Sequence, residues 1–273
     1  IVFFSGKEFL YSFQPVFLFF LVHLSCCNPP RTACIPSLYE YNIKCMRETT
    51  NVQTVTDPEV VDLALGHPDP NLLPLEMMRR AANDRFSQED PLILQYGTEK
   101  GDSKMREELA EFLYRTTGER PEAQELFISG GVSQSLDLLC TLITTPGDYV
   151  FVDNPRYFLA LRIFADHGLR VRGIATDGEG MDTEVLEAAL KKASARGKGP
   201  SLVYTIPSFQ NPRGFCMSER RKRRASELAD EYGFYLLADE VYHPLRYRGR
   251  HVASFGEFID NERILSIGSF SKI

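Results

Sequence analysis

The sequence has few cysteines, no excess of basic residues and no long apolar run, and each of these absences excludes a class of protein. Only Cys140 and Cys216 lie beyond the first 50 residues and no C-x-x-C pair occurs, so we expect no metal site and no disulfide framework. The net charge of −6 and the isoelectric point near 5.5 argue against nucleic-acid binding. We therefore expect neither a metal nor a nucleic acid as a partner.

The first 50 or so residues differ from the rest. The apolar run Val16–Leu24 is shorter than the roughly 20 residues needed to cross a bilayer, so no membrane partner is expected. Two interpretations of residues 1–56 stay open: a poorly ordered or non-native stretch, or an organellar or secretory targeting segment within residues 1–27. The two isolated cysteines of the remaining chain favour a reducing compartment, and we expect the cytoplasm.

Residues 57–273 have the pattern of one large domain in which strands alternate with helices. Short apolar runs predict buried strands at Glu125–Ser129, Tyr149–Val152, Arg170–Ala175, Ser201–Ile206, Phe234–Ala238 and Ile264–Ile267. Amphipathic spacing predicts helices at Leu75–Phe86, Ser103–Thr116, Ser133–Ile143, Tyr157–His167, Thr183–Ala195 and Glu219–Glu231. This alternation is typical of the α/β class, with a mostly parallel sheet and helices on both faces.

Both ends of the chain look cut. The first residue is Ile rather than Met, and the last predicted strand is followed by only a few residues before Ile273. We therefore expect a fragment of a longer protein.

A polar cluster follows five of the six predicted strands, where ligands of parallel sheets bind. These clusters are Ser129–Ser133, Asp153–Tyr157, Pro207–Gly214, Asp239–Tyr242 and Ser269–Lys272. Glycines at the start of a helix let backbone N–H groups approach an anion, although this signal alone is weak. Together the clusters suit one ligand that has a phosphate and a planar ring.

Two side chains narrow that ligand further. Asp239 ends a buried strand, where an acid is costly unless it meets a cation or several donors. Lys272 follows the last strand and offers an amine to a carbonyl group. The ligand would therefore also carry a protonated ring nitrogen and a carbonyl.

The ordered set of these motifs resembles class I/II aminotransferases of the fold-type I enzymes that use pyridoxal 5′-phosphate (PLP). The set consists of Leu94–Gly97, Ser129–Gly131, Asn211–Gly214, Asp239–Tyr242 and Ser269–Lys272. The run from Tyr204 to Gly214 is similar to the branch that contains 2-aminoadipate and kynurenine aminotransferases. The resemblance covers about Val61 to Lys272 and implies a PLP-transferase-like large domain that lacks its C-terminal small domain.

The resemblance also implies a role for each matching residue. Lys272 would be the Schiff-base lysine and acid–base catalyst, Asp239 would hold the ring nitrogen, and Tyr242 would contact the phenolic oxygen of the cofactor. Asn211 would share that contact and also lie near the substrate, while Tyr157 would stack on the ring. The phosphate would be held by Gly131, Val132, Ser133 and Ser269, joined by Tyr96 of a neighbouring subunit in a homodimer. Gly66 would lie near the substrate carboxylate.

The chain also departs from the family pattern. Arg156 and Arg213 stand where small residues are usual, and they either add charge near the site or point outward. The resemblance places the arginine that clamps the substrate carboxylate in the small domain, beyond Ile273. We therefore expect the fragment alone to be inactive, and its amino-acid and 2-oxo-acid substrates cannot be read from these residues.

The resemblance favours transfer of an amino group between an L-amino acid and a 2-oxo acid. Three other interpretations stay open: a PLP lyase similar to aminocyclopropane-carboxylate synthase, a PLP-binding transcription regulator, and a non-catalytic PLP-binding fragment. Residues 1–60 contain few basic residues and no helix-turn-helix pattern, which disfavours the regulator.

Two further features have ordinary structural explanations. The basic run Arg220–Arg224 opens a predicted helix and is interpreted as a solvated helix face rather than a nuclear signal. His243, close to Tyr242, is interpreted as a structural histidine, with a place in the site as the alternative.

Overall fold

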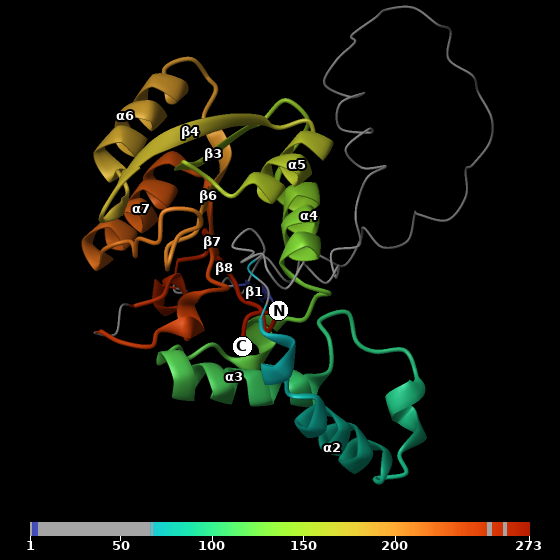
Figure 1. Ribbon diagram of the computed structural model, residues 1–273. Helices are drawn as coiled ribbons and strands as arrows, with labels where there is room; N and C mark the ends of the chain where they lie inside the picture. The colour runs from blue at the N-terminus through green and yellow to red at the C-terminus, as the bar shows by residue number, and fades with distance from the viewer. Residues whose placement is uncertain (1, 5–65, 67, 250–252, 259–260) are drawn as a thin grey trace, which may run out of the picture. The chain divides into compact units, whose positions relative to one another are not determined.

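The computed structural model describes residues 2–4, 66, 68–249, 253–258 and 261–273 (Figure 1). The chain divides into two compact units, one formed by residues 1–15 with 74–273 and the other by residues 16–73. Within the described part of the second unit lies the short helix η1 (Pro70–Leu72), where the Asp69 side chain accepts a hydrogen bond from the Asn71 N–H. The expected boundary at residue 56 lies outside the described residues and stays a prediction.

The first unit is built on one eight-stranded sheet in the order β2-β1-β8-β7-β6-β3-β4-β5. Neighbouring strands from β8 to β4 are parallel, whereas β1 pairs antiparallel with β2 and β8, and β5 pairs antiparallel with β4. The strands are β1 (Val2–Phe4), β2 (Leu126–Phe127), β3 (Tyr149–Asn154), β4 (Arg170–Asp177), β5 (Gly180–Met181), β6 (Pro200–Thr205), β7 (Tyr235–Asp239) and β8 (Ile264–Ile267). The expected α/β class with a mostly parallel sheet is confirmed.

All six predicted helices are present, with ends that differ from the predicted ones by at most one residue. The α-helices are α2 (Leu75–Phe86), α3 (Ser103–Thr117), α4 (Val132–Ile143), α5 (Phe158–Asp166), α6 (Thr183–Ser194) and α7 (Glu219–Tyr232). Four short 3₁₀ helices lie in the loops of this unit: η2 (Pro91–Leu94), η3 (Ala123–Glu125), η4 (His243–Leu245) and η5 (Phe255–Phe258).

Local sequence explains where these helices begin and end. The Asp182 side chain accepts hydrogen bonds from the N–H groups of Glu184 and Val185 at the start of α6, which satisfies donors that have no partner within the helix. At the other end of a helix, Gly233 follows α7 in the left-handed conformation with φ 75°, as expected of a glycine in this place.

Helices cover both faces of the sheet, as predicted. In Figure 1, α6 and α7 lie on one side of the strands and α4 and α5 on the other. The α6/α7 face buries a cluster that includes Phe151, Leu186 and Leu228, and the α4/α5 face buries one that includes Leu139, Phe164 and Leu265. Because every side chain of β8 is buried, this strand reads as a continuous apolar run except for Ser266.

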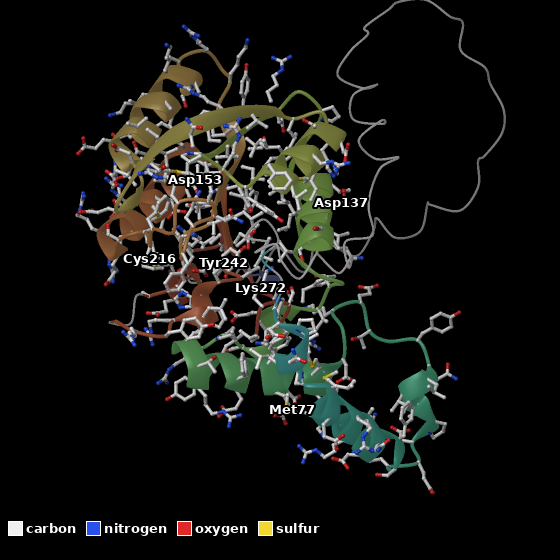
Figure 2. The ribbon with its side chains drawn as sticks, viewed as in Figure 1. Met77, Asp137, Asp153, Cys216, Tyr242 and Lys272 are labelled. Carbon is white, nitrogen blue, oxygen red and sulfur yellow. The ribbon has the colours of Figure 1, made fainter. Side chains whose placement is uncertain are left out.

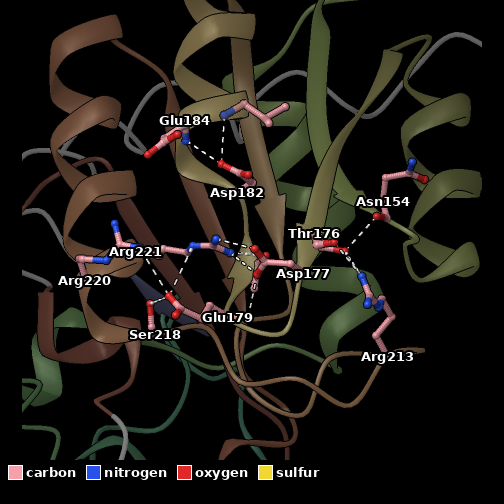
Figure 3. Close-up of polar contacts among 12 residues, drawn as sticks. Asn154, Thr176, Asp177, Glu179, Asp182, Glu184, Arg213, Ser218, Arg220 and Arg221 are labelled. Atoms are coloured by element: carbon pink, nitrogen blue, oxygen red, sulfur yellow. Dashed lines mark hydrogen bonds and ion pairs between the residues drawn. The ribbon is translucent and has the colours of Figure 1, made fainter.

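The interpretation of Arg220–Arg224 as a solvated helix face is wrong for two of its five residues. Arg221 is 7% exposed, and Lys222 is fully buried. The Arg221 guanidinium donates to both carboxylate oxygens of Asp177, at 2.5 and 2.7 Å, and to the Gly180 carbonyl at 2.9 Å (Figure 3). These bonds hold the pKa of Asp177 at about 2 and join α7 to the β4–β5 hairpin.

The interpretation as a solvated helix face fits Arg220, Arg223 and Arg224 better, because each of them pairs with an acid at the surface. Arg223 donates to Glu219 within α7, and Arg224 donates to Glu187 of α6 at 2.9 Å. Exposed pairs of this kind contribute only about 0–1 kcal/mol each. The run therefore separates into residues that face solvent and residues that the helix buries, as helical periodicity requires.

Gly180, in the β4–β5 hairpin, supports a direct stability prediction. It has φ +101°, and a Cβ there would lie 2.9 Å from the Cα of the buried Met217. We expect Gly180→Ala to lower the free energy of unfolding by about 1–3 kcal/mol, because both the backbone conformation and the space oppose a side chain. Gly178→Ala in the same hairpin is the control, since a Cβ there meets nothing within 4 Å. Equal denaturant midpoints for the two variants would contradict this account.

Candidate active site at the strand ends

The polar clusters predicted from the sequence follow the carboxyl ends of five strands. The parallel register pairs Thr205 with Ala238 and Asp239 with Ile267, so β6, β7 and β8 end at one edge of the sheet. Figure 2 labels three side chains from these ends: Asp153 of β3, Tyr242 after β7 and Lys272 after β8. The expected site residues should therefore lie near this edge of the sheet.

Asp239 is the most constrained group of this edge. Its side chain is 3% exposed, and its Oδ2 accepts a hydrogen bond from the Tyr204 hydroxyl at 2.7 Å. Within the described part of the chain, the buried Oδ1 has no hydrogen-bond partner. Burial, with a smaller contribution from the neighbouring Glu240, raises the pKa of Asp239 to about 6. A buried acid with one unsatisfied oxygen suits a donor that carries positive charge.

Tyr204 belongs to the site, although the sequence did not single it out as a site residue. It lies on β6, is 2% exposed and holds Asp239 from the adjacent strand. Its burial, together with Asp239, raises its pKa well above the ordinary value, so it remains a hydrogen-bond donor. The only signal in the sequence was a tyrosine within an otherwise apolar strand, and a buried tyrosine usually has a hydroxyl partner.

Asn211 and Tyr242 come together from different loops, as expected for two groups that share one partner. The Asn211 amide donates to the Tyr242 hydroxyl at 3.5 Å, the limit of a hydrogen bond. Tyr157 faces the same region, since Tyr242 and Asp239 both raise its pKa, although burial is the larger cause. Tyr157 and Tyr242 both pack against the buried cluster on the α4/α5 face of the sheet.

The loop of Asn211 is held by Gln210, which the sequence did not identify. The Gln210 amide donates to the Pro155 carbonyl at 2.9 Å, and its oxygen accepts from the Arg213 N–H at 2.9 Å. The peptide bonds Asn154–Pro155 and Asn211–Pro212 are both cis. One buried side chain therefore connects the loops that follow β3 and β6.

Asp153, at the end of β3, has a structural task beside the site. Its carboxylate accepts from the Thr205 hydroxyl at 3.0 and 3.1 Å and from the Ile206 N–H at 3.0 Å. Burial raises its pKa to about 7, and the same hydrogen bonds oppose that rise. Because these bonds cross from β3 to the end of β6, Asp153 fixes the relative position of two strand ends.

The start of α4 has the features of an anion site that the sequence suggested. Gly131 occupies the N-cap with φ 125°, and no side chain caps the first turn. Val132 and Ser133 therefore begin the helix with N–H groups that have no intrahelical partner. Ser129 turns inward, where its hydroxyl lies 2.7 Å from that of Ser135.

Lys272 lies in a turn after β8 and is partly exposed. In this turn the Ile273 N–H donates to the Phe270 carbonyl at 3.2 Å, and the Ser271 N–H donates to the Ser269 hydroxyl at 3.1 Å. Ser269 and Ser271 also form a short hydrogen bond through their hydroxyls. The roles expected of Lys272 and Ser269 stay predictions.

Tyr96 and Gly66 are the remaining expected site residues. The Tyr96 side chain is fully exposed after η2, which suits a residue expected to act in a neighbouring subunit. Gly66 belongs to the second unit, and its expected place near the substrate stays a prediction.

The two arginines that stand where small residues are usual, Arg156 and Arg213, both contact residues at strand ends. The Arg213 guanidinium is exposed and donates to the carbonyl of Thr176, the next-to-last residue of β4, at 2.7 Å (Figure 3). Arg156 reaches the side chain of Asn154 at 3.5 Å, and its buried Nε has no hydrogen-bond partner in the described residues. Arg213 is therefore anchored on the end of β4.

His243 contacts the loop before Asn211, since its Nδ1 lies 2.9 Å from the Ser208 hydroxyl. Among the described residues, no group of His, Cys, Asp and Glu side chains has the composition of a metal site. No helix among the described residues is long and apolar enough to cross a membrane.

Together, the fold and the strand ends define an α/β protein with a glycine at the start of α4 and a buried acid at the carboxyl edge of a mostly parallel sheet. The chain belongs to the aminotransferase class I and II family, whose model matches residues 58–273.

Two curated relatives and one solved structure illustrate this family membership. Aromatic-amino-acid aminotransferase 1 of Thermococcus litoralis is 34% identical over 222 residues, which are 81% of this chain and 53% of the relative. The uncharacterized HTH-type transcriptional regulator YdcR of Escherichia coli is 30% identical over 81% of this chain and 46% of its own length. The crystal structure of Pyrococcus horikoshii kynurenine aminotransferase with PMP is 33% identical with a TM-score of 0.74, over 88% of this chain and 57% of that one. The chain thus spans about half the length of the curated relatives that it matches.

The raised pKa of Asp239 predicts how pH affects stability. Between the ordinary carboxyl pKa of 3.8 and the folded value of about 6, the folded protein holds a proton that the unfolded chain has lost. Raising the pH through this window therefore lowers the free energy of unfolding. Asp239→Asn cannot ionise, so we expect its melting temperature to rise relative to wild type from pH 4 to pH 7.

The measurement is thermal unfolding across this pH range, without added cofactor. Asp166→Asn, which removes an exposed carboxylate at the end of α5, controls for the loss of one charge. A difference between Asp239→Asn and wild type that stays constant with pH would mean that the Asp239 carboxyl does not titrate in this window.

Proposed function

We propose that this chain is the cofactor-binding part of a PLP-dependent aminotransferase. The observation that carries the proposal is the buried Asp239 Oδ1, which has no hydrogen-bond partner in the described residues and lies at the carboxyl edge of the sheet. A protonated pyridine nitrogen supplies the charged donor that this oxygen needs. Family membership supports the same cofactor, and the kynurenine aminotransferase of similar fold is a complex with PMP.

The described residues fit the other parts of PLP. The N–H groups at the start of α4, with Gly131 as the N-cap, suit its phosphate. Tyr157 offers a ring face, and the Asn211–Tyr242 pair offers donors to the phenolic oxygen. Tyr204 keeps Asp239 oriented.

Lys272 is the proposed catalytic residue. Its Nζ would bind the aldehyde carbon of the cofactor and afterwards move a proton at the substrate Cα. When bound, PLP supplies the electron sink that makes this proton mobile. Asp239, held by Tyr204, would keep the ring nitrogen protonated.

The proposed reaction moves an amino group between an L-amino acid and a 2-oxo acid. A PLP lyase would use the same described residues, so only the products separate the two reactions. Aminotransferases of different substrates are among the relatives, and we leave the amino acid open. Cys140 and Cys216 form no disulfide, which supports a reducing compartment, and we propose the cytoplasm.

Lys272→Ala tests the cofactor proposal. We expect the wild-type chain mixed with PLP to gain a visible absorption band that the variant lacks, because the covalent bond to the amine creates it. Lys191→Ala is the matched control, since Lys191 pairs with Glu187 on the surface of α6. Borohydride reduction followed by peptide mass spectrometry should locate the label on Lys272. A wild-type chain without the band, or a label elsewhere, would refute the proposal for this chain.

The proposed partner is a second copy of the chain. Helix α2 has no buried residue, and it exposes apolar side chains that include Leu75 and Phe86. The following segment continues this surface with Leu92, Leu94 and Tyr96, which are 72%, 79% and 101% exposed. Exposed apolar groups clustered in this way are typical of an interface. The expected contact of Tyr96 with a neighbouring phosphate supports a homodimer in particular.

Leu94→Lys tests the dimer. We expect the dissociation constant to rise by at least about tenfold, because removing one buried leucine from an interface costs about 1.5–3 kcal/mol. Sedimentation equilibrium of wild type and variant measures it. Val185→Lys on α6, where the valine is 41% exposed, is the control and should change nothing. A monomeric wild type at high concentration would show that α2 and η2 do not form this interface.

A further inference from the structure

A buried polar cluster lies on the face of the sheet opposite to the Asp239 side chain, and Glu240 is at its centre. Glu240 is 5% exposed. Its carboxylate accepts from the Phe255 N–H at 2.9 and 3.1 Å and from the Ser266 hydroxyl at 2.8 Å. Its own N–H donates to the Ile267 carbonyl at 2.8 Å. Glu240 therefore holds β8 through both its main chain and its side chain.

The register of the two strands explains why consecutive acids serve different faces. Asp239 pairs with Ile267, and Ala238 pairs with Ser266. Because side chains alternate across a strand, Asp239 and Ile267 face α4 and α5, whereas Glu240 and Ser266 face the α7 side. The segment that carries Lys272 leaves the sheet directly after this pair of residues.

The segment after β8 borders a cavity on the Glu240 side, and at that cavity the Phe270 ring lies 5.5 Å from the Phe112 ring of α3. Residues that line the cavity include Glu119, Glu240, His243, Ser266 and Ser269. Groups that border a cavity lack the close contacts of a filled core. The hydrogen bond between Glu240 and Ser266 adds a buried side-chain contact to the main-chain ladder that joins the end of β8 to β7.

We propose that Glu240 is a positioning residue for Lys272. By holding Ser266 and the Ile267 carbonyl, Glu240 fixes the end of β8 against the strand that carries Asp239. The two groups that would contact opposite ends of the cofactor ring system are thereby kept at a constant separation. This inference rests on the function proposed above, because it assigns Lys272 a cofactor to approach.

Lys222 and two acids, Glu119 and Glu257, are further titratable groups near Glu240. Lys222 is fully buried, donates to the Ala253 carbonyl and lies 5.6 Å from the centre of the Phe255 ring. Burial, and then Glu240 itself, raise the pKa of Glu119 to about 7. Glu119 thus takes up a proton near neutral pH, which reduces the repulsion between the two acids. Glu257, which is exposed on η5, is a further acid near Glu119, and Asp239 precedes Glu240 in the chain.

Ser266→Ala and Glu240→Gln test the proposal, with Glu257→Gln as the control for charge. Ser266→Ala removes one hydroxyl and is the variant less prone to unfold. The first readout is amide hydrogen exchange of residues 264–273 without cofactor. We expect about tenfold faster exchange in both test variants, as the loss of one buried hydrogen bond implies.

The second readout is the pH titration of the visible band of the PLP-loaded chain, which reports the environment of Lys272 Nζ. We expect the titration midpoint to shift by about one pH unit in both test variants and to stay at the wild-type value in Glu257→Gln. The double variant should show no more than the larger single shift, because both changes break the same contact.

The outcomes separate this inference from the proposed function. A wild-type chain that never forms the band overturns both. A normal wild-type band with a titration midpoint unchanged in Ser266→Ala and Glu240→Gln overturns the positioning role alone, even if both variants melt earlier. A shift of equal size in Glu257→Gln would show a general effect of charge and would also overturn it.

Discussion

The main-chain ladder between β6, β7 and β8 is the constraint on which the candidate site depends. It places Thr205 beside Ala238 and Asp239 beside Ile267, so three strands end together. The next residue of each chain segment is then free to leave the sheet at the same edge. The Tyr204–Asp239 hydrogen bond spans this ladder directly, and the Asp153 carboxylate continues it to β3. Without this alignment, the polar loops that follow the strands would not meet at one edge of the sheet.

Alternation along β7 divides the chemistry between two faces. Asp239 faces the candidate site with one oxygen that has no hydrogen-bond partner in the described part of the chain, whereas Glu240 faces away with its oxygens bonded to Phe255 and Ser266. Buried ionisable groups cost free energy, and the protein carries both acids on consecutive residues at the end of a central strand. Asp239, which keeps an oxygen without a partner in the described residues, is consistent with a ligand site. Glu240, whose oxygens are hydrogen-bonded, is consistent with a residue that positions that site.

Much of the fold was readable from the sequence because apolar spacing and turn residues are local signals. All six long helices and the six predicted strands appear, with shifts of a few residues at strand ends. The short strands β1 and β5 were not predicted, since they have three and two residues and exist only through their partners. The basic character of the run Arg220–Arg224 was a poor guide to burial: Arg221 and Lys222 are buried because Asp177 and the Ala253 carbonyl accept their hydrogen bonds, and those partners come from distant elements.

By itself, the sequence determined the α/β alternation, the order of the strand-end motifs and the identities of Asp239, Asn211, Tyr242 and Lys272 as candidates, because each of these lies in a short run of residues. The tertiary structure decided which groups meet. It paired Tyr204 with Asp239, brought Asn211 to Tyr242, turned Arg213 towards Thr176 and set Glu240 against Ser266. These contacts join residues on different strands and loops, so their geometry follows from strand register and packing rather than from any local pattern.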